Sequence, residues 1–442
     1  MNTVDIITKK RNGGMLDPEE IKYLVDGYTC GDIPDYQMSA FLMAVYFCGM
    51  NREETVVLTR CMQLSGDTVD LSGVKGVKVD KHSTGGVGDK TTLIVGPIAA
   101  ACGVPVAKMS GRGLGFTGGT IDKLESIPGL RTAMEEKDFI DQVNTRGIAV
   151  IGQTGHIAPA DKKIYALRDV TATVENLSLI TSSIMSKKLA AGSDAILLDV
   201  KCGRGAFMKS QEEAEKLASL MVDIGNDSGK RTMAVISDME QPLGCAVGNS
   251  LEVQEAIDVL KCQGPEDITE LSVELAGIMV YLSDVLSTEG LNAEEGIAAG
   301  RQTAQKALRS GKALEKFRSF VEGQGGDPAI TEDYSLMSQS SATIDVKSDK
   351  SGYMTALDAM KIGIASQHTG AGRQRKEDDI DLSAGILLRR KCGDEVKRGD
   401  VLCTLYGDDE EKLQAAASEA AEAFAIGDTK PPKAALIKKI IG

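Results

Sequence analysis

Two glycine-rich loops, each placed between a short apolar segment and a helix-like segment, constrain the fold of this chain more than any other feature. The first reads KHSTGGVGDKTT over residues 81–92, and the second reads KMSGRGLGFTGGT over residues 108–120. Apolar segments at residues 77–80 and 104–107 precede them, so each loop is expected at the carboxyl end of a strand. Glycines let backbone N–H groups approach an anion, and a following helix N-terminus adds about half a positive charge. Residues 80–125 therefore predict a phosphate-binding site in an α/β domain.

The side chains of the two loops suit a small phosphate. Lys81 and Lys108 carry positive charge. Hydroxyl groups that can hydrogen-bond a tetrahedral dianion follow them, at Ser83, Thr92, Ser110 and Thr120. Neither loop matches the P-loop or the strict dinucleotide-binding pattern, so inorganic phosphate or a sugar phosphate fits better than ATP or NAD. One such loop forms a plain tight turn as often as it binds a ligand, but two with the same arrangement strengthen the prediction.

One of the three histidines, His82, lies inside the first loop. A histidine alone is usually structural, but beside Lys81 and Ser83 it is predicted to act as a proton donor or hydrogen-bond donor near neutral pH. His156 and His368 have no such neighbours and are interpreted as loop residues. So few histidines, without an H-E-x-x-H pattern, disfavour a zinc enzyme.

Around the loops, short apolar runs alternate with helical patterns, as in a parallel α/β sheet. The predicted strands lie at residues 77–80, 104–107, 148–151, 195–201 and 232–237. Residues 1–65 instead show helical periodicity throughout, with Asp17 and Asn51 as helix N-caps. The strand rhythm also stops between residues 159 and 188, so the chain is expected to return there to the helical part.

We therefore predict an α/β protein built from three domains: a small all-helical domain, a large α/β domain with a mixed, mostly parallel sheet, and a C-terminal α+β domain. The predicted boundaries are residues 1–70 with 158–192, residues 71–157 with 193–330, and residues 342–442. Glycine-rich residues 323–328 and polar residues 335–341 predict a linker before the last domain. A discontinuous helical domain suggests a hinge, with a ligand site between it and the sheet.

Composition excludes several classes of protein. Lys and Arg total 50 against 64 Asp and Glu, a net charge of −14, which disfavours binding to nucleic acid or to an anionic membrane. The nine cysteines are odd in number and never spaced C-x-x-C, so they are interpreted as thiols in a reducing compartment. The chain begins without a signal-peptide pattern, and its longest apolar stretch is shorter than the ~20 residues of a membrane span. We expect a soluble, cytoplasmic protein.

The sequence resembles the pyrimidine and thymidine nucleoside phosphorylases. The likeness is carried by long motifs at residues 81–89, 110–115, 117–125 and 168–173, and it continues through 199–201 and 236–239 into the C-terminal part. It implies a homodimer whose helical domain binds the pyrimidine and whose α/β domain binds phosphate, with domain closure bringing the two together. The phosphate-binding positions that it implies are Lys81, His82, Ser83, Thr92, Lys108, Met109, Ser110 and Thr120.

Three further positions, Arg168, Ser183 and Lys187, are implied as base-binding residues. From the residues alone, Arg168 would be a surface ion-pair residue and Lys187 a solvated helix residue, but the resemblance places both beside the base. His82, Arg168 and Lys187 would be catalytic, with His82 near O2 of the base. The implied reaction is attack of phosphate on C1′ of a pyrimidine nucleoside with inversion, which gives free base and (deoxy)ribose 1-phosphate.

Position 108 bears on sugar specificity, because strict thymidine phosphorylases tend to carry Met where this chain has Lys108. The resemblance therefore implies a broad specificity for uridine, thymidine and deoxyuridine. Phe116 departs from the family pattern, since His is common there, and this bears on contacts with the base.

The resemblance also implies a bound potassium ion, with ligands at Gly88, Lys90, Leu243, Ala246 and Glu255. Lys90 stands where Thr is often found, so only its carbonyl oxygen is available as a ligand. Its ammonium group is an alternative occupant of the same place.

Three alternatives remain open from the sequence: a thymidine-specific phosphorylase, a transferase like anthranilate phosphoribosyltransferase, and a non-catalytic nucleoside-binding regulator. The transferase would need a diphosphate site with Mg²⁺-binding carboxylates, whereas Arg168 and Lys187 supply cations. The regulator would be expected to have lost a key cation, yet Lys81, His82, Arg168 and Lys187 are all present.

Overall fold

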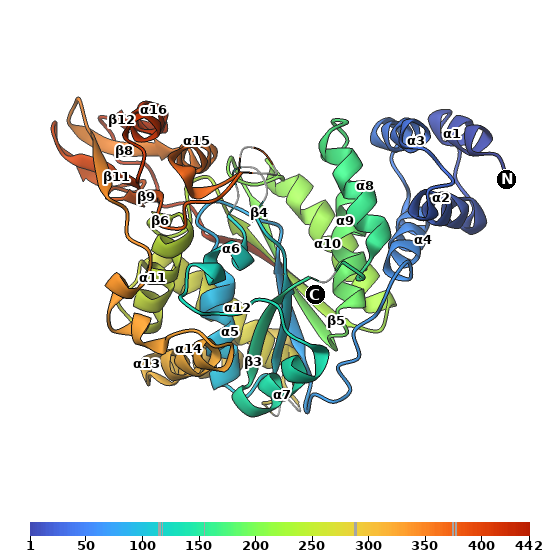
Figure 1. The fold of residues 1–442 in the computed structure, drawn as a ribbon, viewed down its shortest axis with the longest axis horizontal. Helices are drawn as coiled ribbons and strands as arrows, with labels where there is room; N and C mark the ends of the chain where they lie inside the picture. The colour runs from blue at the N-terminus through green and yellow to red at the C-terminus, as the bar shows by residue number, and fades with distance from the viewer. Residues whose placement is uncertain (114–115, 117, 154, 287–289, 374, 376–377) are drawn as a thin grey trace.

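The computed structural model describes residues 1–113, 116, 118–153, 155–286, 290–373, 375 and 378–442. A helical domain and a C-terminal domain lie on opposite sides of a central α/β domain (Figure 1). The predicted three-domain fold class is confirmed.

The helical domain is formed by two separate stretches of the chain. Its helices are α1 (Thr3–Arg11), α2 (Pro18–Cys30), α3 (Asp35–Cys48), α4 (Arg52–Gln63), α8 (Pro159–Asp169) and α9 (Leu177–Ala190). Reciprocal capping boxes start α2 at Asp17 and α4 at Asn51, as the sequence predicts. Buried side chains of α2, α3, α4, α8 and α9 share one core, so the expected return of the chain to this domain is confirmed.

The central sheet has the strand order β1-β4-β5-β13, and β2 and β3 form a separate parallel pair. The strands are β1 (Val79–Ser83), β2 (Val106–Ser110), β3 (Ile148–Gly152), β4 (Ala195–Cys202), β5 (Arg231–Asp238) and β13 (Ile437–Ile441). Strands β1, β4 and β5 run parallel, whereas β13 is antiparallel to β5.

Two predicted strand boundaries are wrong by two or three residues. We expected strands at residues 77–80 and 104–107, but β1 and β2 each continue into the glycine-rich motif and end at Ser83 and Ser110. The sequence pattern predicts that each strand ends where its apolar residues end, but both strands continue through polar residues. Lys81 and Lys108 are only 3% and 4% exposed, because each is paired with a buried carboxylate.

Helices cover both faces of the central sheet (Figure 1). They are α5 (Thr91–Ala101), α6 (Thr120–Glu125), α7 (Glu136–Arg146), α10 (Gln211–Asp227), α11 (Asn249–Leu260), α12 (Glu266–Leu282), α13 (Ala293–Arg309) and α14 (Lys312–Gly323). Helix α5 packs against α12 and α14 on one side, and α10 packs against β4 and β5. Each glycine-rich loop leads into a helix, the first into α5 and the second into α6, as predicted.

The C-terminal domain pairs two small sheets with two helices. Its elements are β7 (Ala342–Lys347), β8 (Gly352–Leu357), α15 (Ala359–Ser366), β9 (Gly385–Leu388), β10 (Glu395–Val396), β11 (Val401–Gly407), α16 (Glu410–Ala421) and β12 (Phe424–Gly427). A short central-domain strand, β6 (Ala246–Val247), pairs with β9 and joins the two domains.

His368 is not the loop residue that we predicted. It lies in a π-helical turn, Gln367–Ala371, that continues α15, and its Nδ1 lies 2.7 Å from a carboxylate oxygen of Glu419 on α16. The turn was missed because Gly370, with φ of 109°, reads as a helix breaker in the sequence.

Two other parts of the C-terminal region differ from expectation. Residues 323–328 are not a free linker, because Gln324 is fully buried and the segment hydrogen-bonds Arg131 and Pro128. A 3₁₀ turn, Tyr334–Leu336, begins the expected polar run. The last strand, β13, returns to the central sheet, so residues 342–442 do not all belong to one separate domain.

None of the helices in the described residues is long and apolar enough to cross a membrane.

Candidate active site

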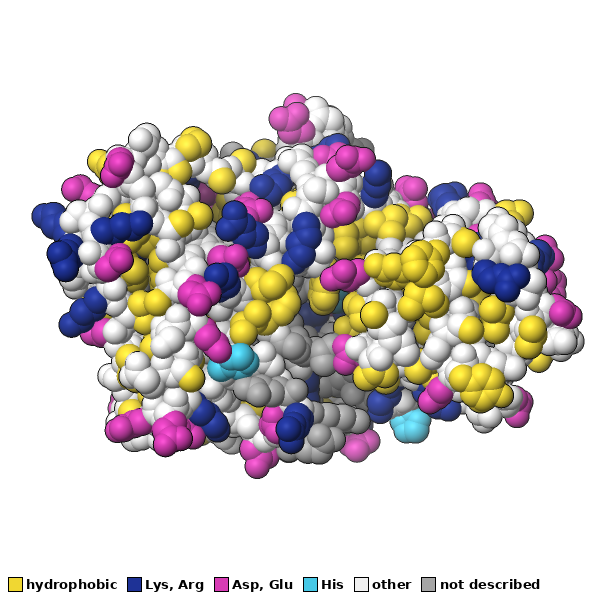
Figure 2. Space-filling view, turned by 90° about the horizontal axis from the view of Figure 1, so that it is seen from above, with side chains coloured by type: hydrophobic (Ala, Val, Ile, Leu, Met, Phe, Trp, Pro, Cys, Tyr) yellow, Lys and Arg dark blue, Asp and Glu magenta, His cyan; other side chains and the backbone are white. Residues whose placement is uncertain are grey.

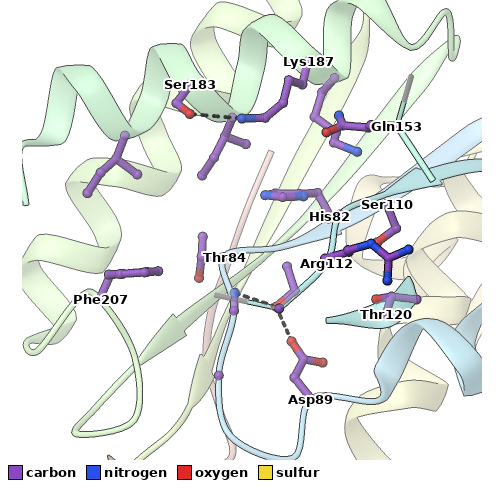
Figure 3. A pocket seen from close by; sticks show the side chains of 18 of the residues that line it. His82, Thr84, Asp89, Ser110, Arg112, Thr120, Gln153, Ser183, Lys187 and Phe207 are labelled. Carbon is purple, nitrogen blue, oxygen red and sulfur yellow. Dashed lines mark hydrogen bonds between the residues drawn. The ribbon is translucent and has the colours of Figure 1, made fainter. Parts of the chain in front are cut away.

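A cavity of about 350 Å³ lies between the two glycine-rich loops and helices α8 and α9. Figure 2 shows the hollow between the helical domain and the rest of the molecule. Ser183 and Lys187 lie on one side of the cavity, Ser110, Arg112 and Thr120 on the other, and the ring of His82 between them (Figure 3). The cavity thus joins the two domains that the sequence assigned to base and phosphate.

The first loop is fixed in its shape by its own hydrogen bonds. The Ser83 hydroxyl accepts from the backbone N–H of Gly85 at 3.2 Å and donates to Asp89 (Figure 3). Gly88 has φ of 71°, and a Cβ there would lie 2.5 Å from the carbonyl oxygen of Leu243, so this position requires glycine. The loop therefore turns tightly and brings Thr92, at the start of α5, to the cavity wall.

Buried lysines surround the phosphate side of the cavity, and two aspartates hold them in place. Asp80 binds Lys188 at 2.7 Å and Lys108 at 3.3 Å. Asp199 binds Lys201 at 2.8 Å and Lys81 at 3.4 Å. Each aspartate thus faces two ammonium groups, which leaves the region with an excess of positive charge suited to an anion.

The pKa of Lys108 is set by opposing effects within this cluster. Burial lowers its pKa, Asp80 opposes that effect, and the ammonium of Lys188 adds to it, so that the pKa of Lys108 falls to about 7. A bound dianion would favour the charged form of this side chain. Lys108 lines the cavity beside Met109 and Ser110.

His82 faces the same lysines. Burial, followed by the charges of Lys188, Lys108 and Lys187, lowers the pKa of His82 well below 6.5. The imidazole is therefore neutral near pH 7, so that one ring nitrogen carries a proton and the other does not. This neutral form suits the hydrogen-bond donor predicted for His82, and the role of proton donor stays a prediction.

The opposite wall is built around Arg168, at the end of α8. Its guanidinium donates to the backbone carbonyls of Thr173, Leu179 and Val174 at 3.1, 3.0 and 2.6 Å, and the residue is 1% exposed. Burial lowers the pKa of Arg168 to about 10, so it stays charged near neutral pH. These bonds use three of its five N–H groups, and the residue lines the cavity.

Lys187 lies one helix away from Arg168, and both cations lie near the ring of Tyr165. The Lys187 ammonium, on α9, contacts Asp161 and lies 3.1 Å from the Ser183 hydroxyl (Figure 3). It lies 5.9 Å from the centre of the Tyr165 ring, and the Arg168 guanidinium lies 5.7 Å from the same centre. An aromatic ring with two cations close to it makes a wall that suits a flat polar ring.

The structure brings nearly all of the predicted substrate-binding residues together. The predicted residues that line the cavity are His82, Ser83, Thr92, Lys108, Met109, Ser110, Thr120, Arg168, Ser183 and Lys187. Lys81 does not line it, because its ammonium turns to Asp199 and to the hydroxyl of Thr91. Phe116 lies outside the cavity lining.

Several lining residues escaped the sequence analysis. Ile180 and Ile184 line the cavity with Ser183 and Lys187, and the spacing i, i+3, i+4, i+7 on α9 is a signal that was available. Lys188 and Phe207 also line it. Nothing local distinguishes Lys188 from a solvated lysine, since its partner Asp80 is distant in sequence.

The residues predicted to bind potassium also come together, but they do not fit the ion. The ammonium of Lys90 contacts Glu255 and donates to the carbonyl oxygens of Leu243 and Ala246 at 3.1 and 2.8 Å. The Gly88 carbonyl accepts from the backbone N–H of Lys90 at 3.0 Å. Burial lowers the pKa of Lys90, but the charges of Glu255, Glu252 and Asp267 and the hydrogen bond to Glu255 together outweigh it, and the pKa is raised. A cation of this protein's own already occupies the place.

Comparisons with known proteins agree with this geometry. A family model described as glycosyl transferase family, a/b domain matches residues 75–314, and the helical bundle domain of the same family matches residues 4–66. A model described as pyrimidine nucleoside phosphorylase C-terminal domain matches residues 353–427. A pyrimidine-nucleoside phosphorylase of Geobacillus stearothermophilus is 55% identical over 411 residues, 93% of each chain. One of Staphylococcus haemolyticus (strain JCSC1435) is 56% identical over 410 residues, again 93% of each chain.

The chain belongs to the pyrimidine-nucleoside phosphorylase family.

The phosphorylase family shares its fold with a transferase. The crystal structure of anthranilate phosphoribosyltransferase from Thermus thermophilus is similar with a TM-score of 0.57, over 72% of this chain and 99% of that chain. Their sequence identity is 19%, so this likeness concerns the fold alone.

Proposed function

We propose that the protein catalyses the reversible phosphorolysis of pyrimidine nucleosides to free base and (deoxy)ribose 1-phosphate. One observation carries the proposal: a single cavity has an anion-binding wall of loops and lysines opposite a wall of Arg168, Ser183 and Lys187. A phosphate on the first wall and a pyrimidine on the second leave the ribose between them.

The phosphate wall positions the nucleophile. Hydroxyl groups of Ser83, Thr92, Ser110 and Thr120 and the N–H groups of the first loop bind the phosphate oxygens, while Lys108 and the buried lysine cluster supply charge. Held there, phosphate attacks C1′ of the nucleoside, and the ribosyl centre develops oxocarbenium character as the bond to N1 breaks.

The base wall stabilises the leaving group. As the glycosidic bond breaks, negative charge develops over O2 and N3 of the pyrimidine, and Arg168 and Lys187 are fixed cations beside it. Both are pre-oriented, Arg168 by backbone carbonyls and Lys187 by Asp161. His82, neutral in the absence of phosphate, is positioned to donate a hydrogen bond to O2 of the base.

The direct test follows release of free base from uridine, thymidine and deoxyuridine with phosphate present. We expect all three to react, and each reaction to stop when phosphate is replaced by sulfate. Release of base from thymidine alone would identify a thymidine-specific phosphorylase. No release from any nucleoside would refute the proposal, and turnover of a phosphoribosyl diphosphate would favour the transferase.

We also propose that Lys108 lets the site accept ribose as well as deoxyribose. Lys108 stands on the cavity wall, tied to Asp80 at 3.3 Å. In Lys108→Met the charge is lost, and we expect kcat/KM for uridine to fall about tenfold more than for deoxyuridine, about 1.4 kcal/mol of selective stabilisation. Lys10→Met, a buried lysine of the helical domain far from the cavity, is the matched control. Equal losses on both nucleosides would refute the role.

We further propose a homodimer formed through the helical domain. Support comes from large apolar side chains left exposed there, with Phe47 78%, Tyr36 73% and Val4 53% exposed. Figure 2 shows hydrophobic side chains gathered over this domain. Sedimentation should give about twice the 46.8 kDa chain mass. Phe47→Asp should give a monomer, whereas Leu336→Asp, on an exposed site of another part, should not. A wild-type monomer at micromolar concentration would refute the dimer.

The cytoplasm is the proposed location. All nine cysteines lie within the described residues and are free thiols, as suits a reducing compartment. Denatured protein isolated with a thiol-blocking reagent should carry nine labels, and any missing pair would argue for an oxidising location.

A further inference from the structure

The side chain of Lys90 is completely buried between three segments of the chain. It leaves the backbone at the start of α5, directly after Gly88 and Asp89 of the first loop. Its ammonium reaches the carbonyl oxygens of Leu243 and Ala246 at 3.1 and 2.8 Å and a carboxylate oxygen of Glu255 on α11. An ammonium group has three N–H donors, so these three oxygens satisfy it fully.

The oxygen atoms around Lys90 are themselves fixed. The second carboxylate oxygen of Glu255 accepts from the backbone N–H groups of Cys245 and Ala246 at 2.8 and 3.1 Å, which points the first oxygen at the ammonium. Leu243 is anchored to the loop by a 3.0 Å bond from its N–H to the carbonyl of Val87. Two carbonyls and one carboxylate, all rigid, form a cage of the kind that binds hard cations.

The cage has no space for a second cation. A Cβ placed on Gly244 would lie 3.0 Å from the Lys90 ammonium and 2.2 Å from the Glu255 carboxylate, so the cage wall already touches its occupant. A metal ion bound by the same oxygens would lie against the ammonium, and two like charges at contact in a buried site repel strongly.

We infer that the Lys90 ammonium replaces the monovalent metal ion implied for this place, so that the protein is held together here by its own side chain and is independent of potassium. With Lys at position 90 in place of Thr, the contact between the first loop, Leu243, Ala246 and Glu255 is made by a side chain and needs no metal ion. It ties the phosphate loop to α11 and to β6, which pairs with β9 of the C-terminal domain. The inference does not rest on the proposed function, because thermal unfolding reports on it without turnover.

The first experiment uses the wild-type protein alone. Thermal unfolding is followed in choline chloride and then in increasing KCl at constant ionic strength. With no site to fill, the Tm should change by less than about 1 °C, whereas a protein with a structural cation site gains stability with the logarithm of the ion concentration. A saturable rise of the wild-type Tm with KCl, absent with choline, would overturn the inference.

The second experiment empties the cage. Lys90→Thr removes the ammonium and leaves its carbonyl and carboxylate partners, so in choline chloride the Tm should fall by about 5 °C. Potassium should enter the emptied cage and restore most of the loss in a saturable way.

A matched control separates the cage from the loss of a buried ion pair. Lys10 is 3% exposed and binds Glu54 at 2.8 and 2.9 Å, with one carbonyl, that of Gly14, at 3.5 Å. Lys10→Thr should be destabilised but should not recover in KCl. If Lys90→Thr likewise gains nothing from KCl, the place is not a cation cage and the inference is wrong. The wild-type titration decides the question independently if Lys90→Thr does not fold.

Discussion

At the scale of single residues, the site depends on charges that are buried and paired rather than exposed. His82 lies among the ammonium groups of Lys188, Lys108 and Lys187, which together with burial keep its pKa well below 6.5. A histidine held neutral can donate to a substrate oxygen without competing with the cations for the phosphate. The charged groups around His82 therefore bear on its role more than its position in a glycine-rich loop does.

This environment predicts how stability depends on pH. The unfolded chain protonates His82 near pH 6.5, while the folded protein does not until the pH is much lower. Below pH 6.5 the unfolded state therefore binds more protons, and the free energy of unfolding falls as the pH falls. From pH 7.5 to 5.5 in phosphate-free buffer, wild type should lose about 1 kcal/mol more than His82→Gln in urea unfolding.

The control for this prediction is His156→Gln, at an exposed position. It should lose stability in parallel with the wild type over the same range. Parallel curves for wild type and His82→Gln would show that His82 is protonated equally in both states.

Sequence alone identified most of the cavity lining, because the loops and the 168–187 region carry long, recognisable motifs. It did not foresee that Lys81 turns away to Asp199, nor that Lys188 shares Asp80 with Lys108. These pairings join residues far apart in the chain. The first depends on how β1 lies beside β4, and the second on how β1 lies beside β2 and α9. The sequence shows that a residue is a lysine and carries a positive charge, but it does not show which carboxylate that lysine will pair with.

Among the elements, the segment after α14 shows most clearly where composition misleads. Gln324 accepts from the N–H of Val150 at 2.9 Å and donates to the carbonyls of Val150 and Arg131 at 2.9 and 2.6 Å. Gln324 thus provides hydrogen-bond partners for the backbone N–H and carbonyl of Val150 in β3. Glycines beside it allow the close approach, so the same glycines that suggest a linker in the sequence serve packing in the fold.

Gln324→Ala should therefore be costly. It leaves the buried N–H and carbonyl of Val150 and the part-buried carbonyl of Arg131 without this partner, and the free energy of unfolding in urea should fall by about 3 kcal/mol. Gln339→Ala, at an exposed glutamine of the nearby polar run, should change it by less than about 0.5 kcal/mol. A small effect of Gln324→Ala would mean that the segment is a true linker in solution.

For the whole molecule, the decisive feature is that the chain crosses three times between the helical and α/β domains, and the crossings hydrogen-bond one another. The N–H of Asp67 donates to the carbonyl of His156 at 2.9 Å, and the N–H of Val69 donates to that of Ala190 at 2.9 Å. A Cβ on Gly192 would lie 2.2 Å from the Val69 carbonyl. The crossings thus form one compact joint between the domain of the base wall and the domain of the phosphate wall, an arrangement typical of a hinge.

We expect this joint to close when both walls are occupied. Adding phosphate together with uracil, a pair that cannot react, should reduce the radius of gyration measured by X-ray scattering, whereas either one alone should have a smaller effect. The same pair added to Arg168→Met, which lacks the base-side cation, should leave the radius near its unliganded value. An unchanged radius in wild type with saturating ligands would argue that the cavity is already closed.

At this scale the sequence predicted the three domains and the discontinuous helical one, because alternating strands and helices and capped amphipathic helices have local signatures. It did not predict that β13 returns to the central sheet, since a short run of Ile and Lys does not indicate which strand it will pair with. Sheet order is decided by which edge remains free after the other elements have packed.

Because β13 lies at the end of the chain, the central sheet cannot be completed until synthesis is nearly finished. The edge of β5 that it covers belongs to a strand whose Val235 and Ile236 are fully buried. The ribosome makes β5 long before residues 437–441, so the nascent chain carries an open, apolar sheet edge while the whole C-terminal domain is still being translated. Such an edge recruits other chains. Chaperone demand and inclusion-body formation should therefore rise whenever translation stalls between these two strands.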